Sequence, residues 1–203
     1  MKALTKLTQE QITPTEALNS LVDGNMRFVQ TTQVKRDLQE QIVETSNGQY
    51  PFAAILSCID SRVPAEIVFD QGIGDIFSAR VAGNIVNEDI LGSIEYACKV
   101  AGSKIVVVMG HTKCGAVTAA CKNVELGNIT ALLSKIKPAV DACCTDEEIT
   151  ESKIEEVAIR NVQLSIDTIR KESAILSEME NEGQIKIVGA IYNVSNGHVE
   201  FLT

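Results

Sequence analysis

The sequence predicts an α/β protein with a mostly parallel central β-sheet that is flanked by helices. Residues 105–108 form an unbroken Ile-Val-Val-Val run, and residues 53–56 form a second short apolar run. Such runs are typical of parallel strands that are buried on both faces of a sheet. Segments with helical patterning separate the expected strands, and this alternation indicates a parallel α/β sheet.

Composition narrows the class of protein. The chain has 203 residues, of which 45% are hydrophobic and 22% are charged. This composition suits one globular domain with a substantial core. The net charge of −9 and the lack of a Lys/Arg cluster argue against a nucleic-acid partner. No apolar run approaches the length of a membrane span, so we expect no membrane partner either.

The cysteine content and the amino terminus predict a cytoplasmic location. The first residues contain no apolar segment of the kind found in signal peptides. The six cysteines do not have the spacing of a disulfide scaffold. In a reducing compartment their thiols stay free to bind metal.

The amino-terminal part of the chain is predicted to be helical. Residues 13–16, Thr-Pro-Thr-Glu, form a capping box with proline at the first helical position. A second amphipathic stretch covers residues 35–45. We expect residues 1–47 to form an arm that packs outside the sheet or on another subunit. Residues 48–203 then form the α/β core of a single domain, 1–203.

The remaining elements follow from apolar runs, caps and turn residues. In chain order we expect a helix at 65–69, a strand at 76–81, a helix at 88–100, the central strand, helices at 115–123 and 129–141, one long helix at 146–180, a strand at 185–194 and a hairpin strand at 199–202. The Gly72-x-Gly74 pair precedes a strand instead of following one, so it is not a dinucleotide-binding fingerprint.

Soft metal ligands are found at the ends of both buried strands. Cys58 ends the first apolar run, and His111 and Cys114 follow the central one. The carboxyl ends of parallel strands form one edge of the sheet, where α/β proteins build their sites. The three side chains can therefore surround one ion, and a Cys₂His set with a free fourth position is typical of catalytic zinc. The alternative interpretation of His111-x-x-Cys114 is a core thiol beside an exposed histidine.

The segments around these ligands resemble the β-class carbonic anhydrases. Cys58-x-Asp60-Ser61-Arg62 followed by His111-x-x-Cys114-Gly115 carries the resemblance. Further similar segments extend over most of the chain, at residues 24–28, 74–77, 80–84, 189–192 and 196–197. On these motifs the chain is identified as a member of that family.

The resemblance implies an enzyme, a carbonic anhydrase (carbonate dehydratase, a lyase), with one Zn²⁺ per chain held by Cys58, His111 and Cys114. The implied reaction is the reversible hydration of carbon dioxide to bicarbonate and a proton by attack of zinc-bound hydroxide. Zinc lowers the pKa of bound water to about 7, as it does in the three-histidine class of carbonic anhydrases. Asp60 and Arg62 are the expected catalytic residues, because a planar guanidinium can hold a carboxylate in orientation beside the metal.

Five residues are expected by resemblance to bind the substrate, partly from the adjacent subunit: Gln49, Phe77, Ala82, Tyr96 and Gly115. Of these, Gln49 would supply an amide donor for the developing oxyanion. The resemblance also implies a homodimer or homotetramer whose amino-terminal helices extend onto the partner subunit.

One position bears on regulation. An unpaired Asp60 could take the fourth zinc position and close the site. Ile55 stands where the bicarbonate-gated members of the family carry tryptophan. We therefore expect the open form of the site at neutral pH.

Other functions remain as alternatives. A carbonyl sulfide or carbon disulfide hydrolase would keep the same ligands. A non-catalytic zinc-binding relative would not need Gln49, Asp60 and Arg62 together. A zinc nucleobase deaminase is excluded, because His111 is followed by Thr112 and Lys113 and not by the His-x-Glu motif.

Overall fold

The protein, described in a computed structural model over residues 2–144 and 149–202, is built on a five-stranded sheet. The strands are β1 (Ala53–Ser57), β2 (Ile76–Arg80), β3 (Ile105–His111), β4 (Lys186–Tyr192) and β5 (Val199–Leu202). They lie in the order β2-β1-β3-β4-β5. Every neighbouring pair is parallel except β4 and β5, which form an antiparallel hairpin. The prediction of a mostly parallel α/β sheet is therefore confirmed.

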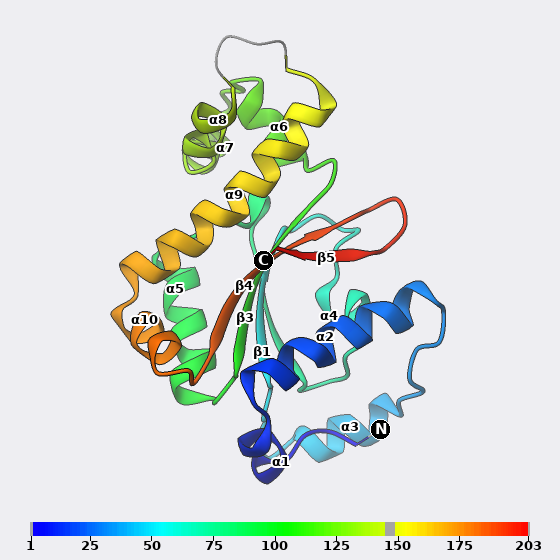
Figure 1. Ribbon diagram of the computed structural model, residues 1–203. Helices are drawn as coiled ribbons and strands as arrows, with labels where there is room; N and C mark the ends of the chain where they lie inside the picture. The colour runs from blue at the N-terminus through cyan, green and yellow to red at the C-terminus, as the bar shows by residue number, and fades with distance from the viewer. Residues whose placement is uncertain (1, 145–148, 203) are drawn as a thin grey trace.

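Helices cover both faces of the sheet (Figure 1). One face carries α2 (Pro14–Val29) and α4 (Ala65–Val68), and the other carries α5 (Glu88–Glu95), α9 (Glu151–Glu172) and α10 (Ala174–Asn181). Beyond the carboxyl ends of the parallel strands lie α6 (Gly115–Cys121), α7 (Gly127–Leu133) and α8 (Lys137–Cys143), and at the opposite end lie α1 (Lys6–Gln11) and α3 (Leu38–Thr45). None of the helices within the described ranges is long and apolar enough to cross a membrane.

The central strand β3 is buried at all seven residues. Because successive side chains of a strand point to opposite faces, Val107 packs with the α2 side of the core, and Val106 and Val108 pack with the α9 side. Full burial of one such side chain stabilises the fold by about 1.5–3 kcal/mol. The apolar run that predicted this strand is thus explained by two separate layers of helices.

The amino-terminal arm packs in part on its own chain. Ala17 and Leu21 of α2 are completely buried against the sheet. Other apolar side chains of this helix, Val22, Met26 and Val29, are exposed. The expected extension of the arm onto a partner subunit therefore stays a prediction, and the exposed side of α2 is the part of the helix that could make that contact.

Two helix predictions are wrong in their boundaries. The helix predicted over 146–180 is interrupted at Ser173, which ends α9 and caps α10 by accepting a hydrogen bond from the backbone N–H of Leu176. Its predicted beginning at residues 146–148 lies outside the described residues. The helix predicted over 129–141 is in fact α7 and α8, and Pro138 lies in the first turn of α8, where a missing backbone N–H costs nothing.

Asn25 ties α2 to the end of α4 and to the β4–β5 hairpin. Its Nδ2 donates to the carbonyls of Val68 (3.1 Å) and Gly197 (2.8 Å), and its Oδ1 accepts from the N–H of Val199 (2.8 Å). The residue is only 3% exposed. Water therefore cannot readily replace these three hydrogen bonds.

We expect Asn25→Ala to lower the free energy of unfolding by about 3 kcal/mol, because three buried backbone groups lose their partner. Asn19→Ala is the matched control, since Asn19 is exposed on the same helix. Urea unfolding of the two variants at equal protein concentration measures the difference. Equal midpoints for both variants would contradict the structural role assigned to Asn25.

Candidate metal centre

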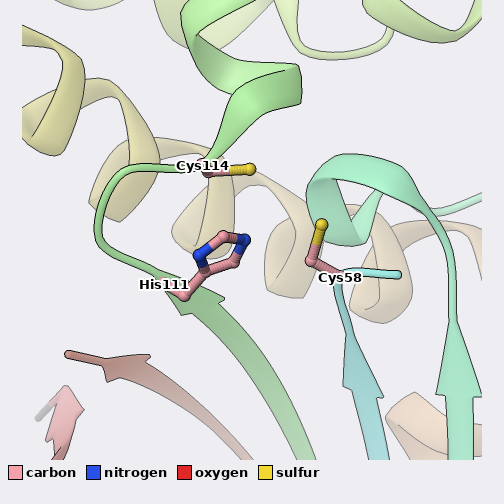
Figure 2. A group of neighbouring side chains, drawn as sticks. All are labelled: Cys58, His111 and Cys114. Carbon is pink, nitrogen blue, oxygen red and sulfur yellow. The ribbon is translucent and has the colours of Figure 1, made fainter. Parts of the chain in front are cut away.

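Three side chains converge beyond the carboxyl ends of β1 and β3 (Figure 2). Cys58 directly follows β1, His111 is the last residue of β3, and Cys114 is the residue before α6. Their ligand atoms all lie within 4.8 Å of one another. The residues are 4%, 1% and 2% exposed, respectively. The parallel pairing of β1 with β3 brings these two strand ends together, so the fold itself assembles the cluster.

The tautomer of His111 leaves one ring nitrogen free to bind a metal. Its Nδ1 lies 2.9 Å from the carbonyl oxygen of Thr112, and a carbonyl oxygen can only accept, so Nδ1 carries the proton. Nε2 is buried and has no hydrogen-bond partner among the described residues. A histidine ligand is oriented in this way when its second nitrogen donates to a backbone carbonyl. The orphaned Nε2 therefore fits a metal ion.

The pKa values of the two buried thiols are shifted in opposite directions. A hydrogen bond from the Cys114 thiol, together with the backbone N–H groups of Gly83 and Asp60, holds the pKa of Cys58 below its usual range. The neighbouring Cys58 sulfur and burial raise the pKa of Cys114. A divalent cation would relieve the repulsion between two adjacent thiolates. Two soft sulfurs and one imidazole nitrogen are donors that suit zinc.

A carboxylate is fixed next to this cluster. Asp60 Oδ1 accepts from Nε and the backbone N–H of Arg62 (both 2.9 Å), and Oδ2 accepts from Nη2 (2.8 Å). These hydrogen bonds hold the pKa of Asp60 well below its usual range. Oδ2 also lies 3.9 Å from Nε2 of His111. An ionised, oriented acceptor therefore stands beside the position that a metal would take.

A second arginine holds the loop between Cys58 and Asp60. Arg80, at the end of β2, donates from Nε to the carbonyl of Cys58 (3.1 Å) and from Nη2 to the carbonyl of Asp60 (2.6 Å). Sequence reasoning gave Arg80 no role of its own. The available signal was its place in the segment at residues 80–84, which carries part of the resemblance.

Two of the five expected substrate-binding residues lie beside the ligands. Ala82 begins the short 3₁₀ turn η1 (Ala82–Asn84), whose Gly83 N–H is 3.4 Å from the sulfur of Cys58. Gly115 directly follows Cys114 and opens α6. Apart from its chain neighbours and its own helix, a Cβ at Gly115 would meet no atom of the described residues within 4 Å, so the space beside the start of α6 is open.

Phe77 and Tyr96 come together elsewhere. Their rings form an edge-to-face pair with centroids 6.2 Å apart and an interplanar angle of 72°. Both line a groove of about 620 Å³ between the edge strand β2 and α5, and none of the three candidate ligands lines it. Tyr96 is exposed and begins the π-helical turn η2 (Tyr96–Val100) that continues α5. These two aromatic residues are therefore separate from the metal cluster of their own chain.

Gln49 is also distant from that cluster. It is exposed and precedes β1, whereas Cys58 follows β1. The five residues of β1 alone span about 16 Å. Gln49 therefore lies toward the opposite end of the sheet from the ligands of its own chain.

The sequence model of the carbonic anhydrase family matches residues 53–199, which include every candidate ligand. Carbonic anhydrase 2 of Mycobacterium tuberculosis is 35% identical over 190 residues, covering 91% of this chain and 90% of that protein. A carbonic anhydrase of Mycolicibacterium smegmatis is 32% identical over 194 residues, and the alignment covers 92% of this chain and 92% of that protein.

Solved structures give the same result. The β-carbonic anhydrase CafA of Aspergillus fumigatus superposes with a TM-score of 0.73 at 26% identity, covering 93% of this chain and 89% of that one. One of two tetrameric β-carbonic anhydrases of Sordaria macrospora superposes with a TM-score of 0.69 at 26% identity, covering 77% of this chain and 83% of that one. The motifs, the fold and both kinds of comparison agree that the chain belongs to the β-class carbonic anhydrase family.

Proposed function

We propose that this carbonic anhydrase hydrates carbon dioxide reversibly to bicarbonate and a proton, using one zinc ion per chain held by Cys58, His111 and Cys114. The observation that supports this most strongly is the buried convergence of two sulfurs and one free imidazole nitrogen within 4.8 Å. When bound, zinc makes hydroxide available at neutral pH by lowering the pKa of a coordinated water to about 7. Three protein donors leave one position free for this chemistry.

Asp60 and Arg62 supply orientation. The Arg62 guanidinium binds both carboxylate oxygens and so holds Asp60 beside the candidate ligands. As an anion, Asp60 can accept a hydrogen bond from the nucleophile and orient it. The same pairing keeps the carboxylate from turning into the fourth coordination position. We therefore propose that the site is open at neutral pH.

The substrate pocket is proposed to form between two copies of the chain. Ala82 and Gly115 lie beside the ligands, but Gln49, Phe77 and Tyr96 do not reach them within one chain. A symmetric dimer brings one face of a subunit onto the partner, and each site can then take its amide donor and aromatic wall from the other chain.

We propose the cytoplasm as the location. All six cysteines are free thiols, and the site needs two of them reduced. A reducing compartment keeps them in that state.

We expect chelator-treated protein to lose carbon dioxide hydration and one equivalent of Zn²⁺ to restore it, because no other group of the site generates hydroxide at neutral pH. Cys114→Ala should lose most of its zinc and its activity. Cys121→Ala is the matched control, since this buried thiol ends the same helix that Cys114 precedes. Stopped-flow hydration assays and metal analysis of the same batch give both quantities.

Two results would contradict this proposal. Equal zinc in Cys114→Ala and wild type would remove Cys114 from the ligand set. A zinc-loaded wild type without hydration activity between about pH 6 and 9 would exclude carbon dioxide as substrate. Carbonyl sulfide and carbon disulfide are then the substrates to assay on that protein.

We expect Arg62→Ala to lower carbon dioxide hydration at neutral pH by about 10- to 100-fold, with zinc content unchanged. The reason is that Asp60 loses its two hydrogen bonds from the Arg62 guanidinium and turns toward the free coordination position. Arg62→Lys should be intermediate, because lysine keeps the charge but cannot bind both oxygens in one plane. Full activity in Arg62→Ala would show that the Arg62–Asp60 ion pair does not matter for catalysis.

The shared pocket predicts complementation between two inactive chains. Cys58→Ala lacks its metal site and Gln49→Ala lacks its amide donor, but a mixed dimer of the two contains one intact site. After subunit exchange we expect about a quarter of wild-type activity per chain. Mixtures that stay as inactive as the separate variants, although mass spectrometry shows mixed dimers, would place Gln49 outside the partner's site.

A further inference from the structure

The turn η1 is held between α9 and the candidate ligand Cys58. On one side, Nδ2 of Asn161 donates to the carbonyl of Gly83 at 2.8 Å. On the other side, the N–H of Gly83 donates to the sulfur of Cys58 at 3.4 Å. Asn161 is 3% exposed, so this chain of contacts lies within the protein interior.

The backbone of Gly83 has a defined orientation in this turn. Its φ of +68° is a left-handed conformation that favours glycine, and an added Cβ would lie 2.5 Å from Cδ1 of Ile136. The turn is closed by a hydrogen bond from the N–H of Asn84 to the carbonyl of Val81 (2.9 Å). Gly83 has no side chain to anchor it. The direction of its N–H therefore depends on what binds its neighbouring backbone groups.

We propose that Asn161 is a positioning residue for the Cys58 sulfur and acts through Gly83. By fixing the Gly83 carbonyl, Asn161 keeps the adjacent N–H directed at Sγ. A hydrogen bond to a ligand sulfur draws charge from it and so changes how strongly that sulfur donates to a metal. This inference rests on the proposed function only in requiring that Cys58 bind the metal.

The same helix provides a control for a merely structural role. One turn beyond Asn161, Oγ of Ser165 donates to the carbonyl of Asn84 at 3.3 Å. Ser165 is also buried, at 6% exposure. It anchors the same turn from the same helix, but not the residue whose N–H meets Cys58. A variant of Ser165 therefore loosens the turn without removing the contact to Gly83.

The test compares Asn161→Ala with Ser165→Ala in the full chain. Zinc affinity is measured by competition with a chromophoric chelator, and the sulfur–metal bond is followed by the thiolate-to-metal charge-transfer absorption of the Co²⁺-loaded protein. We expect Asn161→Ala to bind zinc about 10-fold or more weakly and to shift the Co²⁺ band. Ser165→Ala should keep the wild-type band and a zinc Kd within about twofold.

A second variant covers the case in which Asn161→Ala does not fold. Asn161→Leu keeps nearly the size of the side chain, but it has no N–H to donate to Gly83, so we expect the same two changes. An unchanged zinc Kd and Co²⁺ band in a folded Asn161 variant would overturn the inference. Equal changes in Ser165→Ala would overturn it as well, because turn stiffness would then explain both. A wild type that binds neither metal would instead overturn the metal centre itself.

Discussion

The parallel pairing of β1 with β3 is the constraint on which the rest of the site depends. In this register Ala53 lies opposite Ile105 and Ser57 opposite Met109, so the two strands end at one edge with Cys58 and His111 close together. A slip of one residue would turn every side chain of β1 to the other face of the sheet. Helices on both faces prevent that slip, because they bury alternate side chains of both strands. The packing of the core therefore fixes the position of the ligands.

Neutral polar groups surround the buried ligands, and charged side chains lie closer to the surface. The sulfurs and the imidazole are buried, and the groups that orient them are backbone atoms such as the Thr112 carbonyl and the Gly83 N–H. Charged side chains follow further out, where Arg62 holds Asp60 and Arg80 holds the loop carbonyls. Because the groups near the ligands are neutral dipoles, no further ion has to be buried there. The two arginines are exposed, so their desolvation costs little free energy.

Local patterns predicted most of the fold and the centre of the site. Apolar runs marked the strands, and the three side chains predicted as ligands shortly after those runs lie together in the structure, because strand ends meet in a parallel sheet. The break at Ser173 was missed because a serine can also lie inside a helix, so the residue alone does not mark a helix end. Its capping hydrogen bond from the N–H of Leu176 is seen only in the structure. The hydrogen-bond partners of Asn161 and Arg80 could not be predicted, since they lie 78 and 20 residues away in the chain and are brought close only by tertiary packing. The separation of Phe77 and Tyr96 from their own ligands likewise follows from the sheet order, which places β2 at the edge.

The way in which the ligands are positioned has a consequence for metal selection. In a zinc finger the ion supplies much of the folding free energy, so a poorly fitting ion leaves the chain unfolded. Here two of the candidate ligands, Cys58 and His111, stand at the ends of strands whose burial does not involve them, and Cys114 stands just before α6, so the fold assembles the cluster without an ion. Folding therefore gives no protection against the wrong ion. Divalent ions that bind such donors as tightly as zinc or more tightly can enter the same folded site. The ion found in the cell is then set by which metals are available there, as well as by the two sulfurs and the imidazole.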